Sequence, residues 1–130
     1  GINKANGEFS SNGREGALWV IILLSDGMAN RPCPHNPLCD PYVGCPYARE
    51  YARNETQIAS AMDIAIYTIG LGSSTQSFDE GLLKELQTDG YYYAPSAEDL
   101  IDIYMAIAQD LLFAVKYEIV VLTLTLIKAG

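Results

Sequence analysis

Hydrophobic and polar residues follow one another along this chain in blocks typical of buried strands and amphipathic helices. The most regular block is the apolar run over residues 19–24, which leads directly into Ser25-Asp26-Gly27. An apolar run that ends at a turn predicts a strand buried on both faces, as in a parallel sheet covered by helices. We therefore expect the first strand at residues 17–24, with Asp26 just beyond its carboxyl end.

The rest of the pattern continues this alternation. The expected elements are a short helix at 2–9, a helix at 47–62, a strand at 64–70, a helix capped by Ser77, a strand at 91–93 and a helix capped by Ser96. Strands that alternate with helices predict an α/β fold with right-handed crossovers. The expected architecture is a partial doubly wound, Rossmann-like and mostly parallel sheet flanked by helices.

The last segment, residues 113–130, departs from this order. Aliphatic residues alternate with threonines there, which favours a β-rich extension. A strand of this kind is prone to aggregate at an open edge. We expect this strand either to be an internal strand of this domain or to be covered by a partner chain, another domain or a membrane surface. The residues on the partner-binding side of that strand are Ile119, Val121, Thr123, Thr125 and Ile127.

Composition narrows the function classes. The chain has 130 residues, enough for one domain with a modest core, and a formal net charge of −8 with only 8 lysines and arginines. That charge argues against a nucleic-acid partner, because phosphate binding needs a basic face. Lys116 and Glu118 interrupt the apolar stretch at 111–127. We therefore expect no complete transmembrane helix, although membrane proximity is compatible with the pattern.

Residues 29–46 form a loop insertion rich in proline and cysteine. Such a proline density excludes a regular element. Cys33, Cys39 and Cys45, together with His35, lack the close Cys pairs that are usual in zinc sites. A disulfide in an oxidising, extracytoplasmic compartment fits the loop better, although the sequence leaves the choice of pair open and one cysteine over.

Several motifs occur in a specific order. An acidic turn ends the run at 20–27, an Ile-Gly-Leu-Gly sequence ends the run at 66–72, and a Leu-rich helix and a Gly-aromatic strand precede Leu-Ile-Asp-Ile-Tyr at 100–104. Together they resemble the C-terminal portion of a von Willebrand factor type A domain. The resemblance covers residues 1–112 and implies that the family's first strands are absent from this chain.

The resemblance also implies a divalent cation site. Members of this family hold the cation with an Asp-x-Ser-x-Ser motif, a threonine and an aspartate that corresponds to Asp26. Ser25, which precedes Asp26 in this chain, is a weaker candidate for a cation ligand. The Asp-x-Ser-x-Ser motif does not occur in this sequence. Asp26 is therefore either a turn-forming residue or a ligand for Mg²⁺ whose other ligands come from another segment. The chain would be a fragment, one piece of a split domain or a degenerate domain.

No catalytic set emerges, because His35 has no recognisable partner and no phosphate-binding glycine loop occurs. We therefore expect that this protein is not an enzyme. The first hypothesis is an extracytoplasmic protein–protein interaction or cell adhesion module, pilus or surface associated and cation dependent if the missing ligands are supplied. The second is a structural accessory subunit of a membrane-bound or filamentous assembly, docked through its C-terminal strand. In both, the protein partners include the missing N-terminal part or another subunit.

Overall fold

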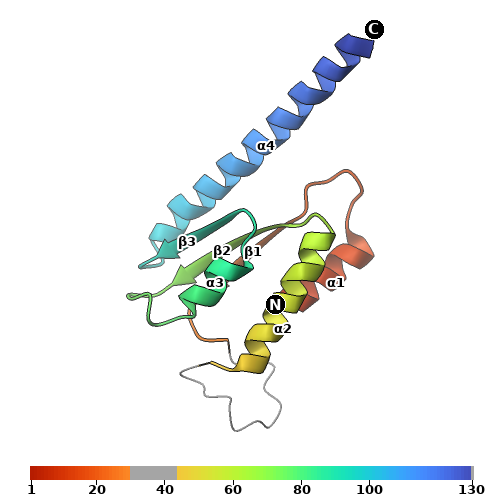
Figure 1. Ribbon diagram of the computed structural model, residues 1–130. Coiled ribbons are helices and arrows are strands. Elements are labelled where there is room, and N and C mark those ends of the chain that lie inside the picture. The colour runs from red at the N-terminus through yellow and green to blue at the C-terminus, as the bar shows by residue number, and fades with distance from the viewer. Residues whose placement is uncertain (30–43, 130) are drawn as a thin grey trace. The chain divides into compact units, whose positions relative to one another are not determined.

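The computed structural model describes residues 1–29 and 44–129, with side chains described to residue 114. In this part of the chain the elements follow the order α1-β1-α2-β2-α3-β3-α4 (Figure 1). They divide into two compact units, Gly1–Ser96 and Ala97–Gly130. The first unit contains the sheet and three helices, and the second contains α4.

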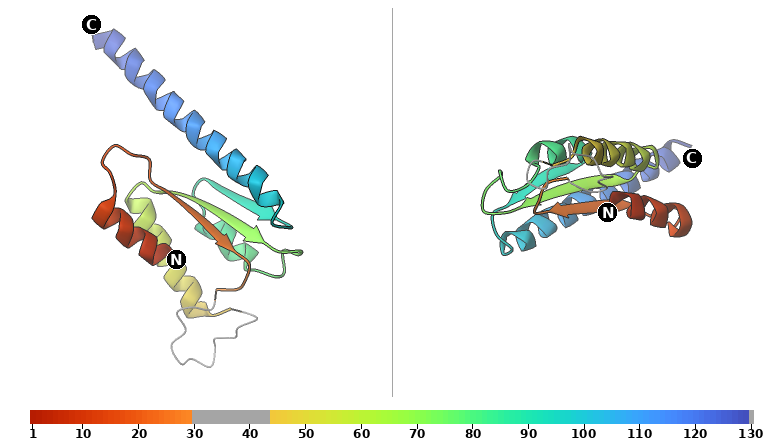
Figure 2. Two further views of the ribbon diagram at one scale, coloured as in Figure 1. Left: turned by 180° about the vertical axis from the view of Figure 1, so that it is seen from behind. Right: turned by 90° about the horizontal axis from the view of Figure 1, so that it is seen from below.

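The sheet is parallel throughout. Its strands are β1 (Val20–Ser25), β2 (Ala65–Leu71) and β3 (Gly90–Ala94), in the spatial order β1-β2-β3. Viewed from behind, the three arrows run in the same direction (Figure 2). In the register, Ile21 lies beside Ile66 and Leu24 beside Ile69. The predicted α/β class with a parallel sheet and flanking helices is confirmed.

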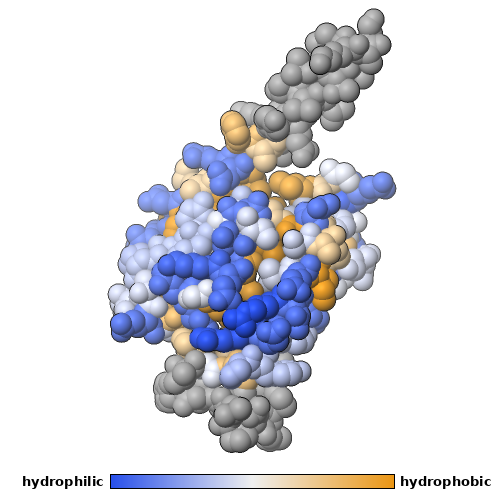
Figure 3. Space-filling view, in the orientation of Figure 1, coloured by the Kyte–Doolittle hydropathy of each residue, from blue (hydrophilic) through white to orange (hydrophobic). Residues whose placement is uncertain are grey.

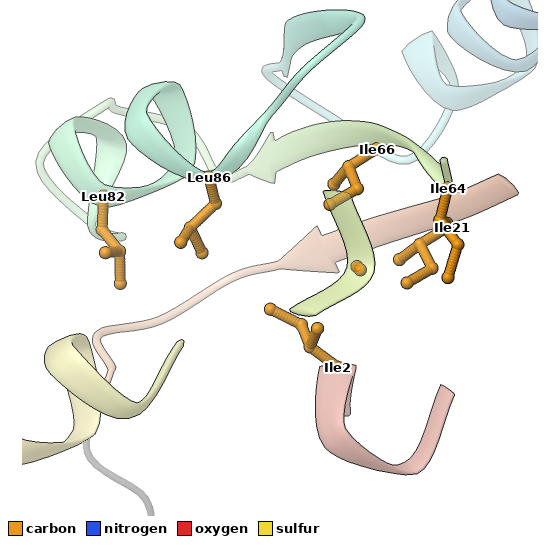
Figure 4. Close-up of a cluster of buried hydrophobic side chains, with 7 residues drawn as sticks. Ile2, Ile21, Ile64, Ile66, Leu82 and Leu86 are labelled. Atoms are coloured by element: carbon orange, nitrogen blue, oxygen red, sulfur yellow. The ribbon is translucent and has the colours of Figure 1, made fainter. Parts of the chain in front are cut away.

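The helices of the first unit are α1 (Ile2–Asn12), α2 (Pro46–Ala61) and α3 (Glu80–Leu86). Together with one face of the sheet they enclose a cluster of buried aliphatic side chains (Figure 4). Its buried members are Ile2, Ile21, Ala59, Ile64, Ile66, Leu82 and Leu86. The space-filling view shows hydrophilic residues over the outside of these helices and hydrophobic residues mainly in the gaps between them (Figure 3).

The start of α3 differs from the sequence prediction. The capping residue is Asp79, whose Oδ1 accepts a hydrogen bond from the Leu82 amide at 3.3 Å. Ser77, the predicted cap, instead donates its hydroxyl to the Ser74 carbonyl at 2.6 Å. Both side chains suit an N-cap, so the sequence offered two starting points two residues apart. The segment before Asp79 forms a turn stabilised by Ser77.

The predicted β-rich extension at 113–130 is wrong, because α4 (Asp99–Ala129) is one continuous helix through that segment. No proline or glycine interrupts the sequence from Asp99 to Ala129. A nucleated helix extends through β-branched residues at a small cost per residue, although these residues also favour strands. Alternate positions of a helix do not share a face. The partner-binding set Ile119, Val121, Thr123, Thr125 and Ile127 therefore does not form the single row that a strand would give. Among the described residues, none of the helices is long and apolar enough to cross a membrane.

Candidate functional site

The outer edge of β1 is the first candidate site. The Ala65 amide donates to the Trp19 carbonyl at 2.9 Å. This hydrogen bond shows that the main-chain groups of Trp19, and of every second residue after it, are directed toward β2. Since alternate residues of a parallel strand bond to opposite neighbours, the main-chain groups of Val20, Ile22 and Leu24 point away from β2. Within the described chain β1 pairs with β2 alone. In that part of the chain, β1 therefore forms an open edge of the sheet.

This edge lacks the features that usually protect an edge strand. The sequence of β1 is Val-Ile-Ile-Leu-Leu-Ser, without a charge or a proline. Ile22 is 39% exposed and Leu24 is 40% exposed. Natural edge strands are usually guarded by lysine, proline or a bulge, because an open ladder accepts another strand. The edge of β1 is therefore chemically suited to pair with an extended segment.

The turn after β1 holds the two residues that the resemblance marks for a cation. The Ser25 hydroxyl donates to the Gly27 carbonyl at 3.2 Å and accepts from the Gly27 amide at 3.5 Å, so it closes the turn locally. Asp26 is exposed. The Gly27 carbonyl also accepts from the Asp79 amide at 3.3 Å, which ties the turn to the start of α3. The turn is thus positioned by the packed unit while Asp26 faces solvent.

Asp79, whose amide contacts this turn, is an acidic residue with other partners. Its Oδ2 lies 2.6 Å from Nε of Arg49 on α2, and its Oδ1 caps α3. The Asp79 side chain is only 9% exposed, so this ion pair has a partly buried, low-dielectric setting. Both carboxylate oxygens are already engaged. Asp79 therefore joins α2 to α3 and is poorly placed to complete a cation site around Asp26.

No group of three or more His, Cys, Asp or Glu side chains gathers in the described part of the chain. Mg²⁺ prefers octahedral oxygen coordination, which Asp26 and Ser25 alone cannot supply. A cation at this turn would need ligands from another segment. Cation binding through Asp26 stays a prediction.

The two ends of the loop insertion lie side by side. The Cys45 amide donates to the Ala29 carbonyl at 2.8 Å, and Gly44 has a φ of +91°, a value that favours glycine. Cys45 is 1% exposed, precedes the first residue of α2 and is disulfide-bonded. Cys33, Cys39 and His35 lie outside the described residues. The choice of disulfide pair therefore stays open.

Sequence reasoning did not single out two buried acidic residues, Asp79 before α3 and Glu55 on α2, each 8% exposed. Glu55 is the one that joins α2 to α1. It accepts hydrogen bonds from Asn3 and Asn6 on α1, at 3.0 and 2.9 Å. A signal was available, since Glu55 lies four positions after Tyr51 and four before Ala59 on the apolar stripe of the helix. Ile58, an apolar residue of the same helix, is 49% exposed.

The geometry defines a small parallel α/β unit with an open strand edge. No family model and no curated protein matches the sequence. Among solved structures, the chain is similar to proximal thread matrix protein 1 from the mussel byssus, with a TM-score of 0.51 and 17% sequence identity. The match covers 82% of this chain and 22% of that protein, so the chain corresponds to about a fifth of its length. At this identity the likeness shows a shared fold.

Proposed function

We propose that this chain is a non-catalytic protein–protein interaction module that takes up an extended segment of a partner along β1. The observation that carries the proposal is the outward-facing ladder of Val20, Ile22 and Leu24. Main-chain hydrogen bonds would supply much of the affinity of such strand addition, and side-chain fit would supply specificity. The partner could be a preceding part of the same polypeptide or a separate subunit.

We further propose a relationship to the von Willebrand factor type A family and an extracytoplasmic location. The parallel order β1-β2-β3 supports the first, because the sequence motifs at 20–27 and 66–72 fall on adjacent strands and the turns after them. The disulfide-bonded Cys45 supports the second, because disulfides persist in oxidising compartments. Adhesion, or attachment to a pilus or a surface, is the role these features favour.

A structural accessory subunit is the second candidate, and one observation favours it. The backbone of α4 stays helical to Ala129, and the sequence at 119–127 is aliphatic apart from two threonines. A helical segment that is apolar on all sides is normally covered. In this second candidate function, the subunit docks through the C-terminal part of α4, because the strand that was expected to mediate docking does not form.

Site-specific photo-crosslinking in the native source tests the main proposal. A photoreactive residue at Leu24 is expected to give a discrete heavier adduct, because a paired strand would lie beside it. The same residue at Ile58, exposed on α2, is the matched control and is expected to give none. The substitution Ile22→Lys should abolish the Leu24 adduct. Equal labelling at both positions, or none at Leu24, would argue against strand addition.

A separate measurement tests cation dependence. If another segment completes the site, Mg²⁺ should raise the melting temperature of the assembled protein, because a ligand that binds only the native state stabilises it. The increase should disappear in Asp26→Ala. Asp63→Ala, in the turn that follows α2, is a control that should keep it. An increase that survives Asp26→Ala would remove this residue from the site.

A further inference from the structure

A cavity of about 520 Å³ lies within the first unit, between the first turn of α1, the end of β1, α2 and α3. Figure 4 shows Leu82 and Leu86 projecting from α3 and Ile2 from α1, and all three line the cavity. Leu23, Ala52 and Leu83 add to the apolar lining. Pockets that bind small organic ligands have this size and this largely apolar character.

One buried carboxylate lies in the wall of this cavity. Glu55 Oε1 accepts from Asn3 Nδ2 at 3.0 Å, and Oε2 accepts from Asn6 Nδ2 at 2.9 Å. Both amide donors are neutral. An ionised carboxylate has about four acceptor positions, so Glu55 has capacity for a further donor. Tyr51 also lines the cavity. Burial, followed by the Glu55 charge and a side-chain hydrogen bond to Glu55, raises the pKa of Tyr51, so its hydroxyl stays protonated and is a third donor to this carboxylate.

The other charged groups at the cavity do not neutralise Glu55. Asp79 is engaged by Arg49 at 2.6 Å. The two cations at the cavity, Lys4 and the amino group of Gly1, belong to exposed residues that form no ion pair with Glu55. In the described part of the chain, no lysine or arginine forms an ion pair with Glu55. A buried carboxylate without a cation is unfavourable. The cavity therefore combines an apolar lining with a negative charge that a cationic ligand would complement.

We propose that this cavity binds a small primary amine with an apolar body about the size of an aromatic ring. The ammonium group donates to Glu55, and the apolar body lies against the leucines of β1 and α3. A charge-assisted hydrogen bond in a largely apolar site gives the ligand its orientation. The cavity shares Leu24 with the edge of β1, but the variants that test it leave β1 and Asp26 unchanged, so its outcome is independent of the proposed function.

Calorimetric titration of the full chain at low ionic strength tests the proposal. The probe is 2-phenylethylammonium, and 2-phenylethanol is its neutral isostere. We expect the amine to bind at least about tenfold more tightly than the alcohol, because only the amine makes a charge-assisted hydrogen bond. Glu55→Gln should remove this preference. Glu50→Gln, an exposed acid on the same helix, should keep it.

Three results would overturn the proposal. They are equal affinity for amine and alcohol, no binding of the amine, and loss of the preference in Glu50→Gln to the same extent as in Glu55→Gln. Ala52→Leu covers the case in which Glu55→Gln fails to fold. It narrows the cavity without changing a charge and should weaken amine binding, while Ile58→Leu on the outside of α2 should not. Unchanged binding in Ala52→Leu would place the amine elsewhere.

Discussion

At the scale of single residues, Gly70 on β2 lies in close contact with Phe78. Phe78 is 2% exposed, and a Cβ built on Gly70 would overlap its ring. The ring also lies against Tyr93 on β3, with centroids 5.9 Å apart. The absence of a side chain at Gly70 therefore allows the segment before α3 to fold down onto the sheet.

Gly70→Ala should destabilise the protein by about 1–3 kcal/mol, because overpacking displaces a buried ring. Gly81→Ala is the matched control. Gly81 lies within α3 with open space around it, so alanine there should stabilise the helix by up to about 1 kcal/mol. Urea unfolding followed by circular dichroism measures both. Similar changes in both variants would contradict this account of the Gly70–Phe78 contact.

Tyr91 on β3 gives a prediction about pH. Burial, followed by a hydrogen bond to Glu80, raises its pKa to about 12. The ordinary tyrosine pKa is about 10. Between pH 10 and 12 the folded state therefore keeps a proton that the unfolded chain loses, so the stability from Tyr91 is complete below pH 10 and falls as pH rises toward 12. Tyr91→Phe should flatten the stability curve in that window.

An ultraviolet absorbance titration measures the same group directly. Subtracting the Tyr91→Phe titration from that of the unmodified protein should isolate one tyrosine that ionises near pH 12. A difference curve centred near pH 10 would show that Tyr91 is not protected by burial and Glu80. Tyr47→Phe, which removes an exposed tyrosine of α2, is the control for the loss of one tyrosine from the chain.

At the scale of elements, α1 is attached to the sheet through a small aromatic contact. Phe9 stacks on Trp19 with ring centroids 5.4 Å apart, and Trp19 Nε1 donates to the Arg14 carbonyl at 3.1 Å. Trp19 immediately precedes β1, so this contact links the end of α1 to the start of the strand. On α1, Ile2 and Asn6 are buried, and Asn6 bonds to α2.

Trp19→Ala should loosen α1 more than the sheet. We expect a loss of about 1–3 kcal/mol, below the range for a fully buried tryptophan because this residue is partly exposed. Hydrogen exchange of α1 amides should rise while the amides of β2 stay protected. Trp19→Phe should keep most of the stacking and serves as the control. Uniform acceleration across the unit would show that α1 and the sheet open together.

The sequence predicted elements well where local pattern and tertiary packing agree. The apolar runs located β1 and β2, and the spacing of apolar residues located α2 to within one residue at each end. The strand prediction at 117–127 was wrong. The β-branched residues there favoured a strand, but no proline or glycine stops the helix from continuing through them. The buried Glu55 depends on Asn3 and Asn6, about fifty positions away, so only the folded structure reveals its partners.

At the scale of the whole molecule, charge and the open edge act together. The formal net charge of −8 at pH 7 keeps copies of the chain apart, which limits association through exposed apolar strands. The sequence pI is about 4.4, so this repulsion vanishes as the solution is acidified. The β1 edge carries no protective charge of its own. We therefore expect the charge of the rest of the chain to limit self-association through this edge.

Light scattering of the full chain should consequently rise as pH falls from 7 toward 4.4, as β1 edges begin to pair with each other. Ile22→Lys should suppress the increase, because a lysine beside the open ladder repels a second strand. Ile58→Lys is the matched control, since Ile58 is 49% exposed on α2 and the substitution changes the net charge by the same amount. If the two variants scatter alike, net charge alone governs association and the β1 edge has no special part in it. If Ile22→Lys alone remains dispersed near the pI, the edge is the surface through which copies meet.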